Sequence, residues 1–310
     1  MILCVNPNAG IDRLVVVPGF RLNTIQRPER VLALPGGKGC NVARALRRLG
    51  ESPVVTGWIG GHAGRFIEEG LHTEGIATDF VYAEGESRTC VSILDPQGHT
   101  LTELYEPGLP VPGAQLEEFT RRFAASVRRY AAVTFSGSLP PGVPPDFYQR
   151  MIEIARAAGA FTVLDSSGEA LRLGLQARPT LVKPNEHEFA DLVGKRLDHP
   201  MAYAQTAMEC AERYHTTVVV SLGAAGAIAA HERAVWRVCP PPVTVQSTVG
   251  SGDSMVAGLV HGLLRGFPLT DVLRWGVVAG AANTLTLGAG VLAVADVQRM
   301  LPRVKVTRVE

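Results

Sequence analysis

Short apolar runs alternate with amphipathic runs through the second half of the chain. Apolar, β-branched stretches predict buried strands at 132–135, 161–164, 180–182 and 217–220. Apolar residues at helical spacing predict intervening helices at 146–158, 186–193 and 201–214. Because strands separated by helices usually pair in parallel, the pattern predicts a doubly wound α/β sheet with helices on both faces.

The first half of the chain is organised differently. A strand is expected at 1–5, and helices are expected at 42–49 and 65–74. Two β-rich segments, approximately 11–35 and 78–110, contain no helical pattern between their strands. We therefore expect the strands of these two segments to pair with one another in a small second sheet beside the large one.

The overall composition bears on partners and location. Lys plus Arg number 30 and Asp plus Glu number 29, so net charge gives no reason to expect nucleic acid or an acidic surface as a partner. Five scattered cysteines without a C-x-x-C pair indicate reduced thiols in a cytoplasmic protein. Residues 275–295 carry no charge, but their glycines, Asn and Thr favour buried packing over a membrane span.

The sequence Thr-Val-Gly-Ser-Gly-Asp-Ser at 248–254 has the pattern of a loop that leads into a helix. It follows an apolar, β-rich run at 243–245 and precedes apolar residues at helical spacing over 255–264. Glycines at a helix N-terminus let unpaired N–H groups approach an anion such as phosphate. Asp253 is then a candidate base for an attacking hydroxyl. A second interpretation is that Asp253 is a first-turn acid, which stabilises any helix.

A second glycine-rich turn, at 35–41, carries Lys38 and Asn41 into the helix expected at 42–49. It is not a Walker A motif, because Lys38 is followed by Gly39 where Ser or Thr is required. Neither glycine-rich turn has the G-x-G-x-x-G spacing of a dinucleotide-binding loop. The two turns therefore argue against a dinucleotide-dependent oxidoreductase.

Polar residues follow four of the predicted strands, at 136–138, 165–167, 183–185 and 221–223. Ligands bind beyond the carboxyl ends of parallel strands, so this edge suits a phosphate-bearing ligand, although loops are polar in any protein. Asn185 and Glu188 fit either a helix capping box or a carboxylate near hydrated Mg²⁺. Arg88, taken by itself, is a surface charge. The eight histidines show no zinc-binding spacing.

Eight short sequences together resemble the ribokinase-like carbohydrate kinases, specifically the phosphofructokinase B branch that contains 1-phosphofructokinase and tagatose-6-phosphate kinase. They run in the family's order over nearly the whole chain, at 8–12, 36–41, 85–88, 136–140, 164–168, 183–188, 221–226 and 249–254. The resemblance implies one ribokinase-like unit over 1–310, with a doubly wound, mostly parallel sheet. It also implies a small β lid formed by segments 11–35 and 78–110.

The same resemblance implies an ATP-dependent kinase that uses Mg²⁺. Its implied acceptor is a ketohexose phosphate, namely fructose 1-phosphate, fructose 6-phosphate or tagatose 6-phosphate, which becomes a bisphosphate. The implied general base is Asp253, beside an anion hole at Gly250, Ser251 and Gly252. The residues implied to hold the acceptor are Asp12, Arg27, Gly37, Lys38, Gly39, Asn41, Arg88 and Ser138. Those implied to lie along ATP are Lys183, Asn185, Ser221, Gly223, Gly226 and Asn283, with Glu188 organising Mg²⁺.

The chain departs from the family pattern near the implied acceptor site. Ala9 stands where Pro is usual, and Cys90 stands where 1-phosphofructokinases often have Asn. The sequence Glu-Pro-Gly that begins at Glu106 replaces a more common Gly-Pro-Gly or Gln-Gly type of sequence. One alternative is therefore a kinase for an unphosphorylated sugar, polyol or nucleoside, in which Lys38 and Arg88 are surface charges. Another is a non-catalytic nucleotide or sugar sensor. The expected partners are a sugar phosphate and ATP, with a homodimer through the lid, and neither nucleic acid nor a membrane.

Overall fold

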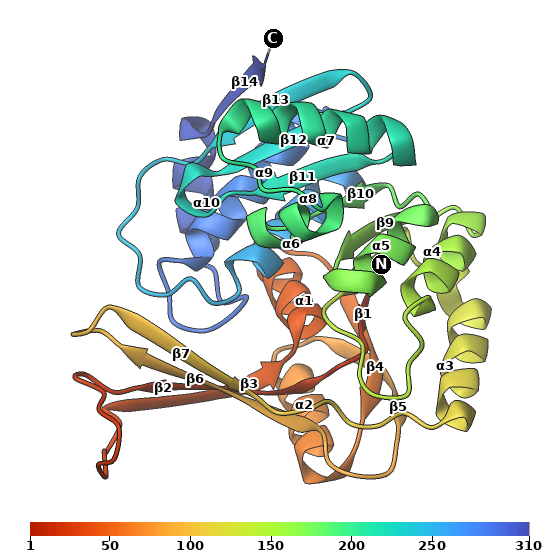
Figure 1. Cartoon of the computed structure of the whole chain (residues 1–310). Coiled ribbons are helices and arrows are strands. Elements are labelled where there is room, and N and C mark those ends of the chain that lie inside the picture. Colours follow the sequence, from red (N-terminus) through yellow and green to blue (C-terminus); the bar gives the residue numbers. More distant parts are fainter. Residues whose placement is uncertain (310) are drawn as a thin grey trace.

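The large sheet has ten strands, most of them parallel, in a computed structural model that describes residues 1–309 (Figure 1). Its strand order is β14-β13-β12-β11-β10-β9-β8-β1-β4-β5. The strands span β1 (Ile2–Asn6), β4 (Pro53–Ile59), β5 (Ala77–Tyr82), β8 (Ala132–Ser136), β9 (Phe161–Asp165), β10 (Leu181–Val182), β11 (Thr217–Ser221), β12 (Ala227–His231), β13 (Ala234–Cys239) and β14 (Lys305–Val309). The pairs from β5 to β11 are parallel, and those from β11 to β14 are antiparallel. The predicted α/β class is confirmed.

Helices cover both faces of this sheet. Successive residues of β1 point to opposite faces, so Ile2 and Cys4 join one hydrophobic cluster while Leu3 and Val5 join the other. Residues of the first cluster come from α1 (Lys38–Arg48), α2 (Gly61–Thr73), α8 (Ser251–Leu264), α9 (Leu269–Asn283) and α10 (Val294–Met300). Residues of the second come from α3 (Gly113–Ser126), α4 (Phe147–Ala157), α5 (Gly168–Gln176), α6 (Glu186–Val193) and α7 (Pro200–Tyr214).

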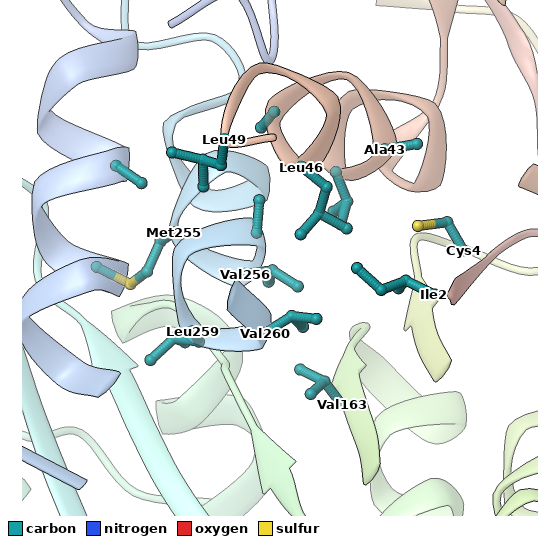
Figure 2. Packing of buried hydrophobic residues seen from close by; sticks show 14 of the residues in the cluster. Ile2, Cys4, Ala43, Leu46, Leu49, Val163, Met255, Val256, Leu259 and Val260 are labelled. Carbon is teal, nitrogen blue, oxygen red and sulfur yellow. The ribbon is translucent and has the colours of Figure 1, made fainter. Parts of the chain in front are cut away.

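Helices α1 and α8 lie side by side in the first cluster. Figure 2 shows Leu46 of α1 facing Val256 and Val260 of α8, with Ile2 of β1 beside them and Val163 of β9 beneath. Each of these five side chains is at most 1% exposed. Because each helix directly follows a glycine-rich turn, this packing brings the two turns together although they are more than 200 residues apart.

A separate four-stranded sheet forms the lid, in the order β3-β2-β6-β7. Its strands are β2 (Gly10–Val16), β3 (Arg30–Gly36), β6 (Arg88–Asp95) and β7 (Thr100–Tyr105). It extends away from the helices that cover the large sheet (Figure 1). The expected lid segment 78–110 is wrong at its start, because β5 pairs with β4 in the large sheet.

Three further features differ from the sequence prediction. The apolar run at 243–245 forms no strand; it follows three prolines at 240–242, which provide no backbone N–H and so end the ladder of β13 at Cys239. The antiparallel strands β12 to β14 and the helices α3 and α5 were not anticipated. The uncharged stretch 275–295, in contrast, agrees with the predicted buried packing, since it comprises the mostly buried end of α9, a turn and the start of α10. Within residues 1–309, no helix combines the length and the apolar character needed to span a bilayer.

Candidate active site

A cleft of about 1100 Å³ lies between the lid and the carboxyl ends of the parallel strands. The N-terminal ends of α1 and α8 form its floor, where Lys38 and Asp253 line it. The lid contributes Asp12 and Arg88, and the strand ends contribute Asp165 among others. The position agrees with the general rule that open α/β sheets bind ligands at this edge.

The start of α8 has the backbone geometry of an anion site. Gly250 adopts a φ of 79°, and a Cβ built on it would lie 2.5 Å from the Cα of Ala289, so only glycine fits. The turn that follows presents the N–H groups of Gly252 and Asp253 without a carbonyl partner in residues 1–309. Unpaired N–H groups at the positive end of a helix dipole stabilise a phosphate oxygen.

Asn283 supports this turn from behind. It is fully buried, donates to the carbonyl oxygen of Val249 at 2.8 Å, and accepts from Ser254 Oγ at 3.0 Å and from Gly290 N at 2.8 Å. It does not line the cleft. The expectation that Asn283 contacts ATP is therefore wrong, because these bonds already occupy its amide in shaping the turn.

Asp253 faces the cleft from the first turn of α8 and is only 7% exposed. Its Oδ2 accepts a hydrogen bond from Asn41 Nδ2 at 2.9 Å. The same amide nitrogen lies 3.4 Å from Oδ2 of Asp12, and the Gly37 N–H also donates to that oxygen at 3.4 Å. Two carboxylates and one amide from three distant segments thus face one another in a single polar cluster.

Arg44 fixes the orientation of this amide. Its Nη1 donates to Asn41 Oδ1 at 3.1 Å and to the carbonyl oxygen of Ala289 at 2.8 Å. Its Nε donates to Glu74 Oε2 at 2.6 Å, and the residue is only 2% exposed. Since the guanidinium donates to Oδ1, the Nδ2 group of Asn41 must point toward the carboxylates.

Two lysines converge on Asp165 at the carboxyl end of β9. Lys38 Nζ and Lys183 Nζ lie 3.3 Å and 3.4 Å from its Oδ1, and Lys38 Nζ is also 3.6 Å from Glu188 Oε1. Asp165 Oδ2 is buried without a hydrogen-bond partner in residues 1–309. The Lys183 ammonium lies 3.5 Å from the point where a Cβ of Gly252 would be. Two positive charges therefore lie near the turn at the start of α8.

Burial and these neighbouring charges shift the pKa values in the cluster. Burial raises the pKa of Asp253 to about 6, against the opposing effect of Lys38. Burial also raises the pKa of Asp12, although Asn41 counteracts it. At Asp165 the adjacent Lys183 and Lys38 outweigh the effect of burial and hold its pKa below the ordinary value. Burial disfavours the charge of Lys38, but Asp165, Glu188 and Asp253 together raise its pKa.

The strand-end residues predicted from sequence line the same cleft: Ser138, Lys183, Asn185, Ser221, Gly223 and Gly226. Asn185 and Glu188 form the capping box that one interpretation predicted, with Glu188 N–H donating to Asn185 Oδ1 and Asn185 N–H to Glu188 Oε2, both at 2.8 Å. Glu188 Oε1 remains on the cleft side, near Lys38. The two interpretations of Glu188 are thus geometrically compatible.

Two predicted acceptor residues do not line the cleft. Arg27 is exposed in the loop between β2 and β3. The Gly39 N–H donates to Asn6 Oδ1 at 3.2 Å, and a Cβ at Gly39 would lie 2.5 Å from Asn6 Cβ. Gly39 therefore lets α1 approach β1 closely, and its N–H is already occupied by the protein.

Four residues of this site were not assigned from sequence. Asp165 had a signal, since it ends a predicted strand inside a matching family sequence. No sequence signal pointed to Arg44, because an arginine in a helix is ordinarily exposed. Glu103 and Tyr105 of β7 line the lid side of the cleft, and only their place in an alternating strand hinted at it.

The comparisons with known proteins agree with this geometry. The chain belongs to the pfkB family of carbohydrate kinases, whose model matches residues 5–294. The family, together with the phosphofructokinase neighbours described next, makes the chain an ATP-dependent sugar kinase.

Solved structures of related kinases superpose over almost the full length. Phosphofructokinase-2 from Escherichia coli, in complex with substrates and products, is 31% identical, with a TM-score of 0.89 over 98% of each chain. The same enzyme in complex with fructose-6-phosphate is 30% identical, with a TM-score of 0.88 over 97% of this chain and 98% of that one. A possible 1-phosphofructokinase from Thermotoga maritima is 28% identical, with a TM-score of 0.90 over 100% of both chains.

Proposed function

We propose that this kinase phosphorylates a ketohexose phosphate to the bisphosphate, with fructose 1-phosphate, fructose 6-phosphate and tagatose 6-phosphate as the candidate acceptors. The observation that carries the proposal is that one cleft combines a buried carboxylate at a glycine-rich helix start with the Arg88 guanidinium on the facing lid. A carboxylate and an anion-binding turn suit phosphoryl transfer, and a second cationic site suits an acceptor that is already phosphorylated.

In this proposal Asp253 acts as general base. Its Oδ2 is oriented by Asn41, and the proton of the acceptor hydroxyl moves to the carboxylate as the phosphoryl group is transferred. In the turn formed by Gly250, Ser251 and Gly252, the Ser251 N–H donates to Thr248, so the free N–H groups of Gly252 and Asp253 stabilise charge on the transferred group without reorganising. Lys38 and Lys183 neutralise phosphate charge from the opposite side.

The remaining cleft residues divide between the two ligands. Asp12, Gly37, Lys38, Asn41 and Ser138 surround the acceptor, and Arg88 receives its phosphate. Asn185, Ser221, Gly223 and Gly226 lie along the nucleotide, where the apolar wall of 240–243 accommodates a flat base.

Mg²⁺ fits the residues present. Among residues 1–309 no group of three or more His, Cys, Asp or Glu side chains is arranged to hold a metal. Mg²⁺ accompanying nucleotide phosphates retains several waters and needs only one or two carboxylates. Glu188 Oε1, which faces the cleft, and the unpartnered Asp165 Oδ2 supply such oxygens. When bound, the ion would neutralise charge on the donor phosphates.

The state of the cysteines supports the expected cytoplasmic location of the enzyme. All five cysteines are free, which fits a reducing cytoplasm.

On the lid, β7 is an edge strand with every residue exposed, including Leu104 at 59%. An exposed apolar edge strand favours association, so we include a homodimer through the lid in the proposal.

A kinase for an unphosphorylated sugar is the second candidate, because the departures at Ala9, Cys90 and Glu106 lie on or beside lid strands. A coupled assay of ADP release over a panel of free and phosphorylated sugars separates the two candidates. Arg88→Ala should raise the KM for the sugar phosphate strongly, since a charge-assisted hydrogen bond is lost. If free sugars react equally well and the KM of Arg88→Ala is unchanged, the phosphorylated acceptor is excluded.

A further inference from the structure

Arg88, the first residue of β6, is held on three sides. Its Nε donates to the carbonyl oxygen of Asn8 at 3.2 Å. A Cβ built on Gly10 would lie 2.9 Å from Arg88 Cγ, so the arginine stem occupies space that only a glycine leaves open. On the third side, the Arg88 Cζ lies 6.0 Å from the centroid of the Tyr105 ring, within the range of a cation–π attraction.

Tyr105 is itself held by its neighbours on the lid. Its hydroxyl donates to Glu103 Oε1 at 2.6 Å, and Ser92 Oγ donates to the same carboxylate oxygen at 3.3 Å. In the strand register Tyr105 lies opposite Cys90, and Glu103 lies opposite Ser92. These side chains all line the cleft. The phenol is a donor at neutral pH even at its ordinary pKa of about 10, and partial burial and the hydrogen bond to Glu103 raise the pKa of Tyr105 further.

These contacts orient the guanidinium of Arg88 before any ligand binds. Within residues 1–309 its hydrogen bond is made by Nε, which leaves the two terminal nitrogens for a ligand. An arginine that is already held loses less side-chain freedom on binding, and this improves affinity without a new contact to the ligand.

We propose that Tyr105 is a positioning residue for Arg88 and thereby determines affinity for phosphorylated acceptors. The inference rests on the proposed function, in which Arg88 receives the acceptor's phosphate. It adds a residue that does not touch the phosphate, and it gives Glu103 and Ser92 the task of holding the Tyr105 ring over the guanidinium.

Steady-state kinetics with the sugar phosphate that reacts best in the panel tests this role. Tyr105→Leu should raise the KM for that acceptor by about two- to fivefold, the range of a cation–π contact at an exposed site, while kcat and the KM for ATP stay unchanged. Tyr105→Phe keeps the ring but loses the bond to Glu103, so it should raise this KM less than Tyr105→Leu does. Tyr82→Leu, at an exposed tyrosine of β5 outside the cleft, is the matched control and should leave all three constants unchanged.

A double-mutant cycle distinguishes positioning from direct contact. In an Arg88→Ala background, Tyr105→Leu should have no further effect on the KM for the sugar phosphate. An equal increase in both backgrounds would mean that Tyr105 contacts the acceptor itself, and would overturn the inference. If Arg88→Ala raises the KM but Tyr105→Leu does not, the inference alone fails. If Arg88→Ala leaves the KM unchanged, the assignment of Arg88 to the phosphate fails first, and the inference falls with it.

Discussion

Asn41 donates a hydrogen bond at 2.9 Å to Asp253, a residue 212 positions later in the chain. The bond joins the first turn of α1 to the first turn of α8, so it depends on the packing of these two helices. It also stabilises the ionised form of Asp253, opposing the burial that raises its pKa. Asn41 thus orients the proposed catalytic carboxylate and is one of the groups that lower its pKa.

Asp253→Asn should abolish most of the activity. The amide cannot accept the proton of the acceptor hydroxyl, so kcat should fall by about two to four orders of magnitude, which is typical for loss of a general base. ATP affinity, measured by titration calorimetry, should change little because the anion-binding N–H groups remain. Turnover close to that of the unaltered enzyme would refute the role of Asp253.

The pH dependence of kcat/KM should report the same carboxylate. Since the pKa of Asp253 is raised to about 6, activity should be near its plateau above pH 7 and fall with an apparent pKa close to 6 as the carboxylate is protonated. Asn41→Ala removes a bond that lowers this pKa, so its acidic limb should move to higher pH. An acidic limb near pH 4 in the unaltered enzyme would contradict the burial of Asp253.

Asp253→Asn should also stabilise the fold at neutral and alkaline pH. The folded pKa of about 6 exceeds the value of 3.8 for an unperturbed Asp, so the folded state binds a proton that the unfolded state has already lost. Stability therefore falls as the pH rises through this interval, and the full penalty is present above about pH 7. Removing it should add about 3 kcal/mol to the free energy of unfolding at pH 8.

Denaturant unfolding at two pH values checks this linkage. The gain from Asp253→Asn at pH 8 should be clearly smaller at pH 5, where the native carboxyl of the parent enzyme is largely protonated. Asp271→Asn is a suitable control, because Asp271 is a half-exposed first-turn acid of α9 outside the cleft. An equal gain at both pH values would rule out titration of Asp253 as its source.

Local sequence patterns were enough to predict the large sheet and the start of the helix that carries Asp253. The strand and helix alternation after residue 130 predicted the large sheet, and the turn at 248–254 predicted a helix start whose Asp253 lies in the cleft. The family resemblance assigned Lys38, Asn41 and Arg88 to the same ligand, the acceptor. In the structure these three residues line one cleft. Their individual roles remain part of the proposal.

Residues that depend on tertiary contacts escaped prediction. Asn283 lies at the end of α9 and was assigned to ATP, but its partners Val249, Ser254 and Gly290 come from three segments that only the fold brings together. In the sequence Arg44 looks like an exposed helix arginine, and only the structure shows that it is buried and bonded to Asn41. β5 resembles a lid strand because periodicity reveals a strand but not the sheet to which it belongs.

Alanine at two nearby glycines should separate a structural role from a phosphate-binding role. Gly250→Ala forces a side chain onto a φ of 79° and within 2.5 Å of Ala289 Cα, so it should destabilise the fold by about 2 kcal/mol or more. At Gly252 the new methyl would meet only the end of the Lys183 side chain, with Nζ at 3.5 Å and Cε at 4.0 Å, so the melting temperature should stay nearly unchanged. That methyl would nevertheless occupy the space between the free N–H groups and the lysine, where the proposal positions the transferred phosphate. A displacement of about 1 Å there should lower kcat by about 100-fold. Normal turnover in Gly252→Ala, measured beside its melting curve, would mean that the phosphate binds elsewhere.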